Sequence, residues 1–326
     1  MGADYFITDF TEDFVQPDGF SFNSGYTNSI AAAYTEADIF FSRDLALKAG
    51  IRASYSDIVG SAVAEPRIAL AYQVGKNGQF SLAYGDFHQT PKQNYLKYYR
   101  NFEYEKTSHY IFNYLYNTDG KMFRAEAYYK DYADLVKFDT PMAEYNSVFS
   151  NAGSGFAKGI DLFWRDSRTI KNLDYWVSYS YIDSKRDYRN YEYSVTPNYI
   201  AKHNFSIVTK YWLNDLRSQV GVTYSYNSGR PYDNPNEAQF MNGLTKSYNN
   251  LSISWAWLMS QQKILYFSVS NVIGSDNIFG YEYANTPDMN GAYNRQPVTQ
   301  PADRFFFIGF FWTISDDKKT NKLDNL

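Results

Sequence analysis

The stretch Leu251-Ser252-Ile253-Ser254-Trp255-Ala256-Trp257 carries a large apolar side chain at every odd position and Ser or Ala at every even position. The stretch Phe123-Arg124-Ala125-Glu126-Ala127-Tyr128-Tyr129-Lys130 repeats this alternation, with Arg124, Glu126 and Lys130 at even positions. Successive side chains of a β-strand point to opposite faces of a sheet. Both stretches therefore predict strands with one apolar and one polar face.

Aromatic residues supply much of the apolar side. The chain has 326 residues, of which 33 are Tyr, 25 Phe and 6 Trp. The dry core of a soluble β-sandwich is filled mainly by Val, Ile and Leu rather than by Tyr. Tyr suits a position near a membrane surface, because its ring is apolar and its hydroxyl group binds water. The composition therefore favours strands that face a membrane.

Bulk properties exclude several classes of protein. The mean hydropathy is -0.52, and no stretch approaches the roughly 18 consecutive apolar residues of a membrane helix, which excludes a helical membrane protein. Lys and Arg number 31 against 35 Asp and Glu, without a long basic run, so nucleic acid is not an expected partner. The absence of cysteine excludes disulfides and thiolate metal sites and agrees with an oxidising compartment.

The N-terminal stretch Met1-Gly2-Ala3-Asp4-Tyr5 has neither the positive region nor the apolar run of a secretory signal. A barrel destined for an outer membrane needs such a signal. We therefore expect either that a signal was removed or that residue 1 is not the natural start of the protein.

Alternation bounded by turn residues recurs along the whole chain. It predicts thirteen strands and a candidate fourteenth, near residues 28–41, 45–56, 67–75, 78–87, 105–117, 120–131, 154–166, 173–185, 198–212, 216–227, 246–257, 262–273, 303–314 and 4–14.

The predicted connections alternate between short and long without exception. Short turns are expected near 42–44, 75–78, 117–120, 167–172, 214–215 and 259–261, and long loops near 57–66, 88–104, 132–153, 186–197, 228–245 and 274–302. This order places all short turns at one end of the sheet. It predicts an all-β fold, an antiparallel up-and-down transmembrane β-barrel. Strands of roughly 10–14 residues agree with this, since a tilted membrane strand needs about 9–11.

Several motifs, in their order and spacing, resemble those in the C-terminal part of the β-barrel of a TonB-dependent outer-membrane receptor. They are FSLAYGDFHQTP at 80–91, GSGFAKGID at 153–161, YWVSYSY at 175–181, SGRPY at 228–232, VSNVIG at 269–274 and RFFFIGFFW at 304–312. The resemblance implies a 22-stranded barrel, an N-terminal plug domain and a segment that engages TonB. At about 25 residues per strand this chain supplies only about 13 strands, so the plug and the remaining strands are expected outside it.

Three regions are expected on this basis. Residues 1–27 form an N-terminal strand fragment and loop, and residues 28–314 form the transmembrane strands with long extracellular loops. Residues 315–326 form a polar C-terminal tail, expected to be a periplasmic extension because charged segments of this kind rarely bury enough apolar surface to fold.

Catalytic and metal-binding sites are not predicted. His88, His109 and His203 stand on separate strands or loops without a nearby ligand-type partner, whereas a zinc site needs three or four ligands. No Gly-x-Ser-x-Gly motif marks a serine nucleophile. We therefore expect no enzymatic activity, no metal and no cofactor.

Charged side chains occur within the predicted strands, mainly opposite the larger apolar ones. Arg or Lys facing lipid at the bilayer midplane costs about 2–4 kcal/mol, so these residues are expected to line the lumen. They form either a hydrated charge network, which is the simpler interpretation, or a contact surface for a plug or substrate. They are Lys48, Arg52, Arg124, Glu126, Lys130, Lys158, Asp161 and Arg165.

Two long loops combine aromatic side chains with a cation. Binding residues concentrate on loops that a stiff scaffold holds in place. The candidates for ligand contact are Arg230, Tyr232, Tyr281, Tyr283, Tyr293 and Arg295. The same residues could equally be ordered structure beside the barrel mouth.

The resemblance implies a receptor in the outer membrane of a Gram-negative bacterium for TonB-dependent uptake of a scarce nutrient such as a siderophore, cobalamin or a glycan. Its partners would be outer-membrane lipid, the barrel-assembly machinery through the last strand, and a plug domain and the TonB system in the full-length protein. One alternative is a self-contained 14-stranded passive porin, which must pair residues 4–14 with 303–314. Another is a soluble aromatic-rich β protein that binds glycans by ring stacking.

Overall fold

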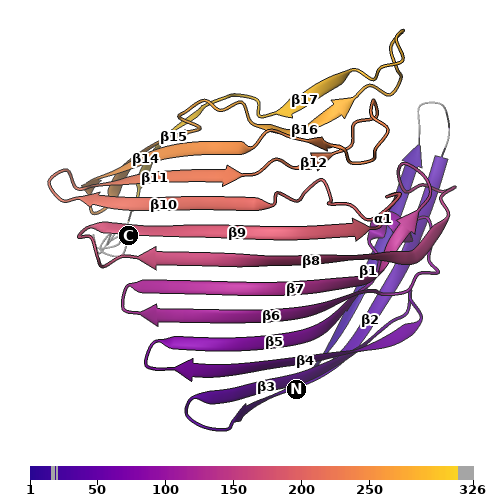
Figure 1. Ribbon diagram of the computed structural model, residues 1–326, viewed down its shortest axis with the longest axis horizontal. Coiled ribbons are helices and arrows are strands. Elements are labelled where there is room, and N and C mark those ends of the chain that lie inside the picture. Colours follow the sequence, from indigo (N-terminus) through magenta and orange to yellow (C-terminus); the bar gives the residue numbers. More distant parts are fainter. Residues whose placement is uncertain (16–18, 20, 315–326) are drawn as a thin grey trace. The chain divides into compact units, whose positions relative to one another are not determined.

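The computed structural model describes residues 1–15, 19 and 21–314. The tail expected at residues 315–326 lies outside the described residues. The regular secondary structure of the described chain is almost entirely β-strand (Figure 1).

Fourteen strands of the described chain form one sheet, in the order β1-β2-β3-β4-β5-β6-β7-β8-β9-β10-β11-β14-β15-β18. Sheet neighbours are thus also neighbours among these strands along the chain, as in an up-and-down meander (Figure 1). The strands are β1 (Gly2–Val15), β2 (Ser21–Phe40), β3 (Leu45–Ser56), β4 (Ser61–Val74), β5 (Gly78–Gln89), β6 (Glu105–Thr118), β7 (Lys121–Phe138), β8 (Phe149–Asp166), β9 (Leu173–Asp187), β10 (His203–Leu213), β11 (Ser218–Asn227), β14 (Tyr248–Ser260), β15 (Lys263–Ser270) and β18 (Phe305–Trp312). The predicted all-β meander is confirmed.

The chain divides into two compact units. The first comprises residues 1–114, 126–159 and 183–197, and the second comprises 115–125, 160–182 and 198–326. Strands β1 to β5 belong wholly to the first unit, and β10, β11, β14, β15 and β18 belong to the second.

In the first unit the side chains sort by face as the sequence predicts. Leu47 of β3 pairs with Leu70 of β4, whereas Arg52 pairs with Glu65 on the opposite face. The apolar face is uncovered: the side chain of Leu82 is 56% exposed. A face of adjacent exposed Leu and Ile residues is unfavourable in water but favourable against lipid.

The second unit repeats this arrangement with larger rings. Trp255 of β14 pairs with Phe267 of β15, which in turn pairs with Ile308 of β18. Ile308 is 71% exposed. On the other face, Ser254 pairs with Ser268. The apolar faces of both units are thus suited to a membrane and not to a dry interior.

The connection between β3 and β4 is shorter than predicted. Residues 57–66 were expected to form a long loop, but β4 begins at Ser61 and only residues 57–60 connect the two strands. Gly60 has φ of 69° and donates its N–H to the carbonyl oxygen of Ser56 over 2.9 Å, closing a tight turn. Pro66 suggested a loop, but it pairs with Ile51 inside the sheet. Residues that precede a proline favour extended backbone, so the strand continues through it. The strict alternation of short and long connections was therefore wrong at this position.

Some segments expected as plain loops contain secondary structure. In the second unit β12 (Pro231–Tyr232) pairs with β13 (Gly243–Leu244), and β16 (Ile278–Tyr283) pairs with β17 (Arg295–Thr299). In the first unit the β5–β6 connection contains the short helix α1 (Gln93–Leu96). No helix in the described residues is long and apolar enough to cross a membrane.

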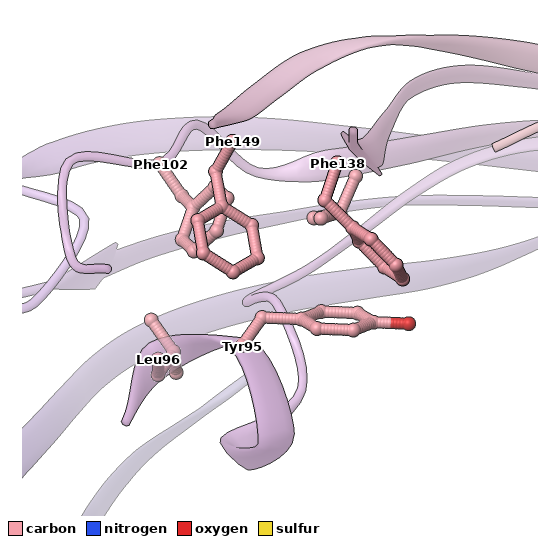
Figure 2. Close-up of a cluster of buried hydrophobic side chains, with 6 residues drawn as sticks. Tyr95, Leu96, Phe102, Phe138 and Phe149 are labelled. Atoms are coloured by element: carbon pink, nitrogen blue, oxygen red, sulfur yellow. The ribbon is translucent and has the colours of Figure 1, made fainter. Parts of the chain in front are cut away.

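A dry core in the first unit lies among its loops. Tyr95 and Leu96 of α1 pack with Phe102, Val136, Phe138 and Phe149 (Figure 2). The rings of Phe102 and Phe149 meet edge to face with centroids 5.6 Å apart. Burying rings of this size is a major source of packing energy, so the core holds the β5–β6 connection against the ends of β7 and β8.

The sheet of the described residues is not closed. β1 and β18 stand at its two ends, and each pairs with a single neighbour, β2 and β15 respectively. The pairing of residues 4–14 with 303–314 that a 14-stranded porin requires is therefore not formed.

Candidate ligand-binding site

Two glycines allow three strands of the first unit to crowd together. A Cβ atom on Gly153 of β8 would lie 2.5 Å from the carbonyl oxygen of Leu135 and 2.8 Å from that of Asp187. A Cβ atom on Gly155 would lie 2.6 Å from the carbonyl oxygen of Lys185 and 2.8 Å from Cγ of Arg186. Only a residue without a side chain fits there, so these glycines bring the ends of β7 and β9 against β8.

The close contact between the backbones of β8 and β9 positions Arg186 near the end of β9. Its backbone exchanges two hydrogen bonds with Val195: the N–H of Arg186 donates over 2.9 Å and its carbonyl oxygen accepts over 3.1 Å. The Arg186 guanidinium lies 4.1 Å from the ring centroid of Tyr132. A guanidinium over an aromatic face is attracted by the ring quadrupole, so Tyr132 fixes the orientation of the cation.

Arg189 adopts a backbone conformation that is rare for residues other than glycine. Its φ is 54°. This left-handed conformation costs of order 1–3 kcal/mol and persists only where surrounding contacts impose it. Here the N–H of Arg189 donates to Val136 over 2.7 Å, and its carbonyl oxygen accepts from Phe138 over 3.0 Å. The guanidinium lies 4.9 Å from the ring centroid of Tyr188.

Together these elements enclose a cavity of about 350 Å³ in the first unit. Its wall combines cations, tyrosines and apolar side chains from β5, β6, β7, the end of β9, the β5–β6 connection and the segment that follows β9. The lining residues are Phe87, His88, Gln89, Lys92, Tyr95, Glu105, Lys106, Thr107, Tyr132, Leu135, Val136, Arg186, Tyr188 and Arg189. We call this space the β5–β9 cavity.

The one acidic side chain that lines the cavity, Glu105, is hydrogen-bonded to neighbouring protein groups. Glu105 is buried, and its carboxylate accepts hydrogen bonds from Nε2 of Gln89 at 2.7 Å and from the N–H of Val136 at 3.0 Å. Lys106 in turn pairs with Asp86 at 3.3 Å. The remaining cations of the wall, Lys92, Arg186 and Arg189, therefore outnumber its one carboxylate, and the wall is net positive.

Three buried polar atoms of the wall have no hydrogen-bond partner within the described chain: Nδ1 of His88, Oγ1 of Thr107 and Nε of Arg189. Nδ1 of His88 stands 3.6 Å from the nearer carboxylate oxygen of Glu65, beyond a good hydrogen bond. Leaving such atoms unsatisfied is unfavourable, so this wall is suited to a polar molecule in the cavity.

The guanidinium of Arg189 stays protonated despite its burial. Burial acts to lower the pKa of Arg189, but interactions with Tyr188, Tyr95 and Tyr191 outweigh it and raise the pKa above its ordinary value. The cavity wall therefore keeps a fixed positive charge at any physiological pH.

Comparison with known proteins agrees with this arrangement of strands and loops. A family model described as TonB dependent receptor-like, beta-barrel matches residues 1–272. The chain belongs to the TonB-dependent receptor-like β-barrel family. No curated protein matches the chain in a sequence search.

Solved structures show the same fold for this TonB-dependent receptor-like barrel. The outer membrane transporter YddB from Escherichia coli is 12% identical with a TM-score of 0.69, over 95% of this chain and 50% of that one. The iron transporter FrpB from Neisseria meningitidis is 14% identical with a TM-score of 0.68, over 89% and 46%. The ferric-catecholate import receptor Fiu from E. coli is 12% identical with a TM-score of 0.65, over 89% and 45%. The chain thus spans about half the length of these proteins.

Four of the six predicted loop residues come together in the second unit of the barrel chain. Tyr232 of β12 and Tyr281 of β16 have ring centroids 4.7 Å apart. The guanidinium of Arg295 lies 4.6 Å from the Tyr281 centroid and donates a hydrogen bond to the Tyr232 hydroxyl over 3.1 Å. Tyr283 also interacts with Arg295 and raises its pKa. Because Arg295 is bound by the tyrosines, the cluster joins the two hairpins; its contact with a ligand stays a prediction.

The other two predicted loop residues make different contacts in the second unit. Tyr293 exchanges backbone hydrogen bonds with the side chain of Asn236 at 2.6 and 2.9 Å. Arg230 exchanges hydrogen bonds with Thr245 through its backbone, both of 2.9 Å.

In the first unit, the charged strand residues predicted to line the lumen have nearby partners. Lys48 pairs with Glu36 and Arg52 with Asp4, each at 2.7 Å. The carboxylate of Glu126 accepts from Asn113 at 3.2 Å, the Nζ atom of Lys130 lies 5.3 Å from the Tyr128 centroid, and Lys158 pairs with Asp183 at 3.6 Å.

In the second unit, Arg165 makes a two-point contact with Asp174 at 2.7 and 3.0 Å. Asp161 accepts a hydrogen bond from Ser180. Arg124 and Asp161 line a second cavity, of about 320 Å³, together with Ser and Asn side chains. These pairs are what a hydrated charge network would contain, and contact with a plug or substrate stays a prediction.

The three histidines lie apart in aromatic and polar surroundings. His109 contacts the Phe87 ring, with centroids 4.7 Å apart, and Nδ1 of His203 lies 2.9 Å from the hydroxyl oxygen of Tyr179. Among the described residues, no group of three His, Asp or Glu side chains is arranged to hold a metal ion.

The residues of the β5–β9 cavity were not predicted from the sequence. Arg186 and Arg189 lie in the segment Lys185-Arg186-Asp187-Tyr188-Arg189, which resembles an ordinary solvated loop. The available signal was the pair Gly153 and Gly155 in the motif GSGFAKGID, because two glycines in one strand indicate close backbone approach.

Proposed function

We propose that the chain is the barrel part of an outer-membrane receptor that takes up a scarce nutrient with energy from TonB. The observation that carries this proposal is the family match over residues 1–272, on a sheet that superposes on TonB-dependent transporters. Known barrels of this family are outer-membrane proteins of Gram-negative bacteria, which supports the same location for this one. Exposed apolar sheet faces agree with it.

The nutrient class is proposed from the neighbours and from the site. Fiu is a ferric-catecholate import receptor and FrpB an iron transporter, so a ferric siderophore is the first candidate. Cobalamin and glycans remain the other two classes to test. A cavity with charged and aromatic walls at the loop end of the strands supports uptake of a polar small molecule.

The partners follow from the family. In the full-length protein we expect a plug domain and the TonB system to act on this barrel, lipid to cover its apolar faces, and the barrel-assembly machinery to engage β18. The aromatic sequence of β18, with Phe310, Phe311 and Trp312 at its end, agrees with the last of these. We propose no catalytic role, because the family and its solved neighbours are transport receptors.

A passive porin is the alternative function. It fits the sheet poorly, because β1 and β18 each have one neighbour in the described chain. A 14-stranded channel would need these two strands to pair, since lipid leaves no partner for unpaired backbone groups.

Transport by the full-length receptor in its native host tests the proposal. Cells should grow on a ferric siderophore, on cobalamin or on a glycan as limiting nutrient only when both the receptor and TonB are present. Deletion of the receptor gene alone and deletion of TonB alone should give the same defect. Uptake that continues without TonB would overturn the proposal in favour of the passive channel.

A further inference from the structure

We propose that the β5–β9 cavity binds a ring compound that carries a carboxylate group. The inference rests on the proposed uptake function, because it names the chemistry of the ligand or of the part of the ligand that enters this cavity. Its support is the charge, the shape and the rigidity of the cavity wall.

The charge of the wall selects an anion. Lys92, Arg186 and Arg189 line the cavity with Lys106, which pairs with Asp86, and the wall holds one acid, Glu105. Glu105 accepts from the neutral donors Gln89 and Val136 and keeps its negative charge, so the cations outnumber it and the wall is net positive. Placing another anion beside Arg189 in a partly buried site is favourable, because screening by water is weak there.

The donors in the wall are arranged for a planar anion. A guanidinium offers its N–H groups in a flat fork that matches the two oxygens of a carboxylate. The unpartnered Nε of Arg189 belongs to such a fork, and Thr107 adds a buried hydroxyl group on the same cavity. A carboxylate would satisfy donors that the protein itself leaves without a partner.

The remaining wall selects a ring. Phe87, Leu135 and Val136 contribute apolar surface, and Tyr95, Tyr132 and Tyr188 contribute rings. Rings and sugar faces pack well on such side chains. A volume of about 350 Å³ lies near the lower end of the roughly 300–1,000 Å³ of ligand pockets. The cavity therefore suits one or two rings and not a large ligand as a whole.

The site is organised before a ligand arrives. The uncommon φ of Arg189 is fixed by backbone bonds to Val136 and Phe138, and Gly155 lets β9 bring Arg186 to the wall. A site whose donors are already oriented loses less conformational entropy on binding, which raises both affinity and selectivity.

The test is a binding titration with the purified full-length receptor in detergent. The probes are benzoate and glucuronate, which share a carboxylate on a six-membered ring, with benzyl alcohol and methyl glucoside as neutral counterparts. We expect at least one carboxylate to bind about tenfold or more tightly than its neutral counterpart, as the loss of a charged hydrogen bond implies. The stronger of the two distinguishes an aromatic acid from an acidic sugar.

Two variants test whether the carboxylate probe binds in the β5–β9 cavity. Arg189→Asn removes the guanidinium with a residue that tolerates positive φ, and Arg186→Gln leaves the backbone of residue 189 unchanged. Each should weaken carboxylate binding about tenfold. Lys76→Gln, in the turn between β4 and β5, is the matched loss of a cation elsewhere and should have no effect. Correct folding is checked by resistance of each variant to unfolding in detergent at room temperature.

Equal binding of charged and neutral probes, or unchanged binding in both arginine variants, would overturn the inference. If TonB-dependent transport is observed, these outcomes do not contradict the proposed uptake function. Conversely, selective carboxylate binding without any TonB-dependent transport would support the cavity assignment and reject the transport function.

Discussion

Gly155 is the residue on which the position of Arg186 depends most directly. We expect Gly155→Ala to destabilise the receptor by about 1–3 kcal/mol, because overpacking forces neighbouring backbone to shift. The added Cβ would stand 2.6 Å from the Lys185 carbonyl oxygen and 2.8 Å from Cγ of Arg186. The shift should also weaken carboxylate binding. Thermal unfolding in detergent and the probe titration measure the two effects.

Gly280 provides the matched control for this substitution. No heavy atom lies within 4 Å of a Cβ placed there, so Gly280→Ala should leave both stability and binding unchanged. If the two alanine variants behave alike, the crowding between β8 and β9 does not matter for the site.

The face on which a strand residue lies could be predicted from the sequence, because it depends only on the alternation along that strand. Alternation along β3 placed Lys48 and Arg52 on the polar face, and both have acidic partners there. Tyr232, Tyr281 and Arg295 were predicted as ligand contacts from the composition of two loops; their contact with one another was not predicted, and ligand contact stays a prediction. Arg186 could not be found this way, because its role depends on contacts with β7 and β8 that no local pattern encodes.

At the scale of elements, the β5–β6 connection is tied to the first two strands through Lys97. Its Nζ atom lies 2.9 and 3.0 Å from the carboxylate oxygens of Glu12 on β1, and its carbonyl oxygen accepts from Ser24 on β2 over 2.7 Å. Burial acts to lower the pKa of Lys97, but Glu12 and Tyr98 raise it above its ordinary value. The connection is thus held best while Lys97 is charged.

The direction of this pKa shift fixes the pH dependence. A group whose pKa is raised by folding stabilises the folded form fully below its unfolded pKa, near 10.4 for Lys, and stops doing so as the pH rises through the folded pKa. We therefore expect cleavage within residues 90–104 by an alkaline protease to be slow at pH 8 and to rise above about pH 10.5. Glu12→Gln should be cleaved faster at pH 8 already and should lose most of the pH dependence. A steep rise in this variant equal to that of the unchanged protein would show that another group titrates.

Strand boundaries show which elements a sequence pattern can define. β3 runs from Leu45 to Ser56, as predicted, because clear turn residues precede it and its alternation is unbroken. β4 was predicted too short, since Pro66 and the small residues before it hide the pattern. The hairpins β12–β13 and β16–β17 were missed because such short pairs are stabilised by contacts between loops and not by alternation.

For the molecule as a whole, the open sheet and the family assignment support each other. A sheet that ends in lipid at β1 and β18 would leave backbone N–H and C=O groups without partners. A larger barrel would supply partner strands for both edges. The apolar residues at the β18 edge, such as Ile308 and Phe310, are exposed in the described chain.

Cysteine cross-linking in the full-length receptor tests this arrangement, and these 326 residues contain no cysteine of their own. The pair Leu265→Cys and Phe310→Cys joins residues that face each other across β15 and β18, and it should cross-link in high yield with a short bis-thiol reagent. Ile7→Cys of β1 combined in turn with Phe306→Cys, Ile308→Cys or Phe310→Cys of β18 should not cross-link, because in a larger barrel other strands separate the two. Efficient cross-linking between β1 and β18 would mean that these strands close a 14-stranded barrel, which favours a passive channel over the TonB-dependent receptor.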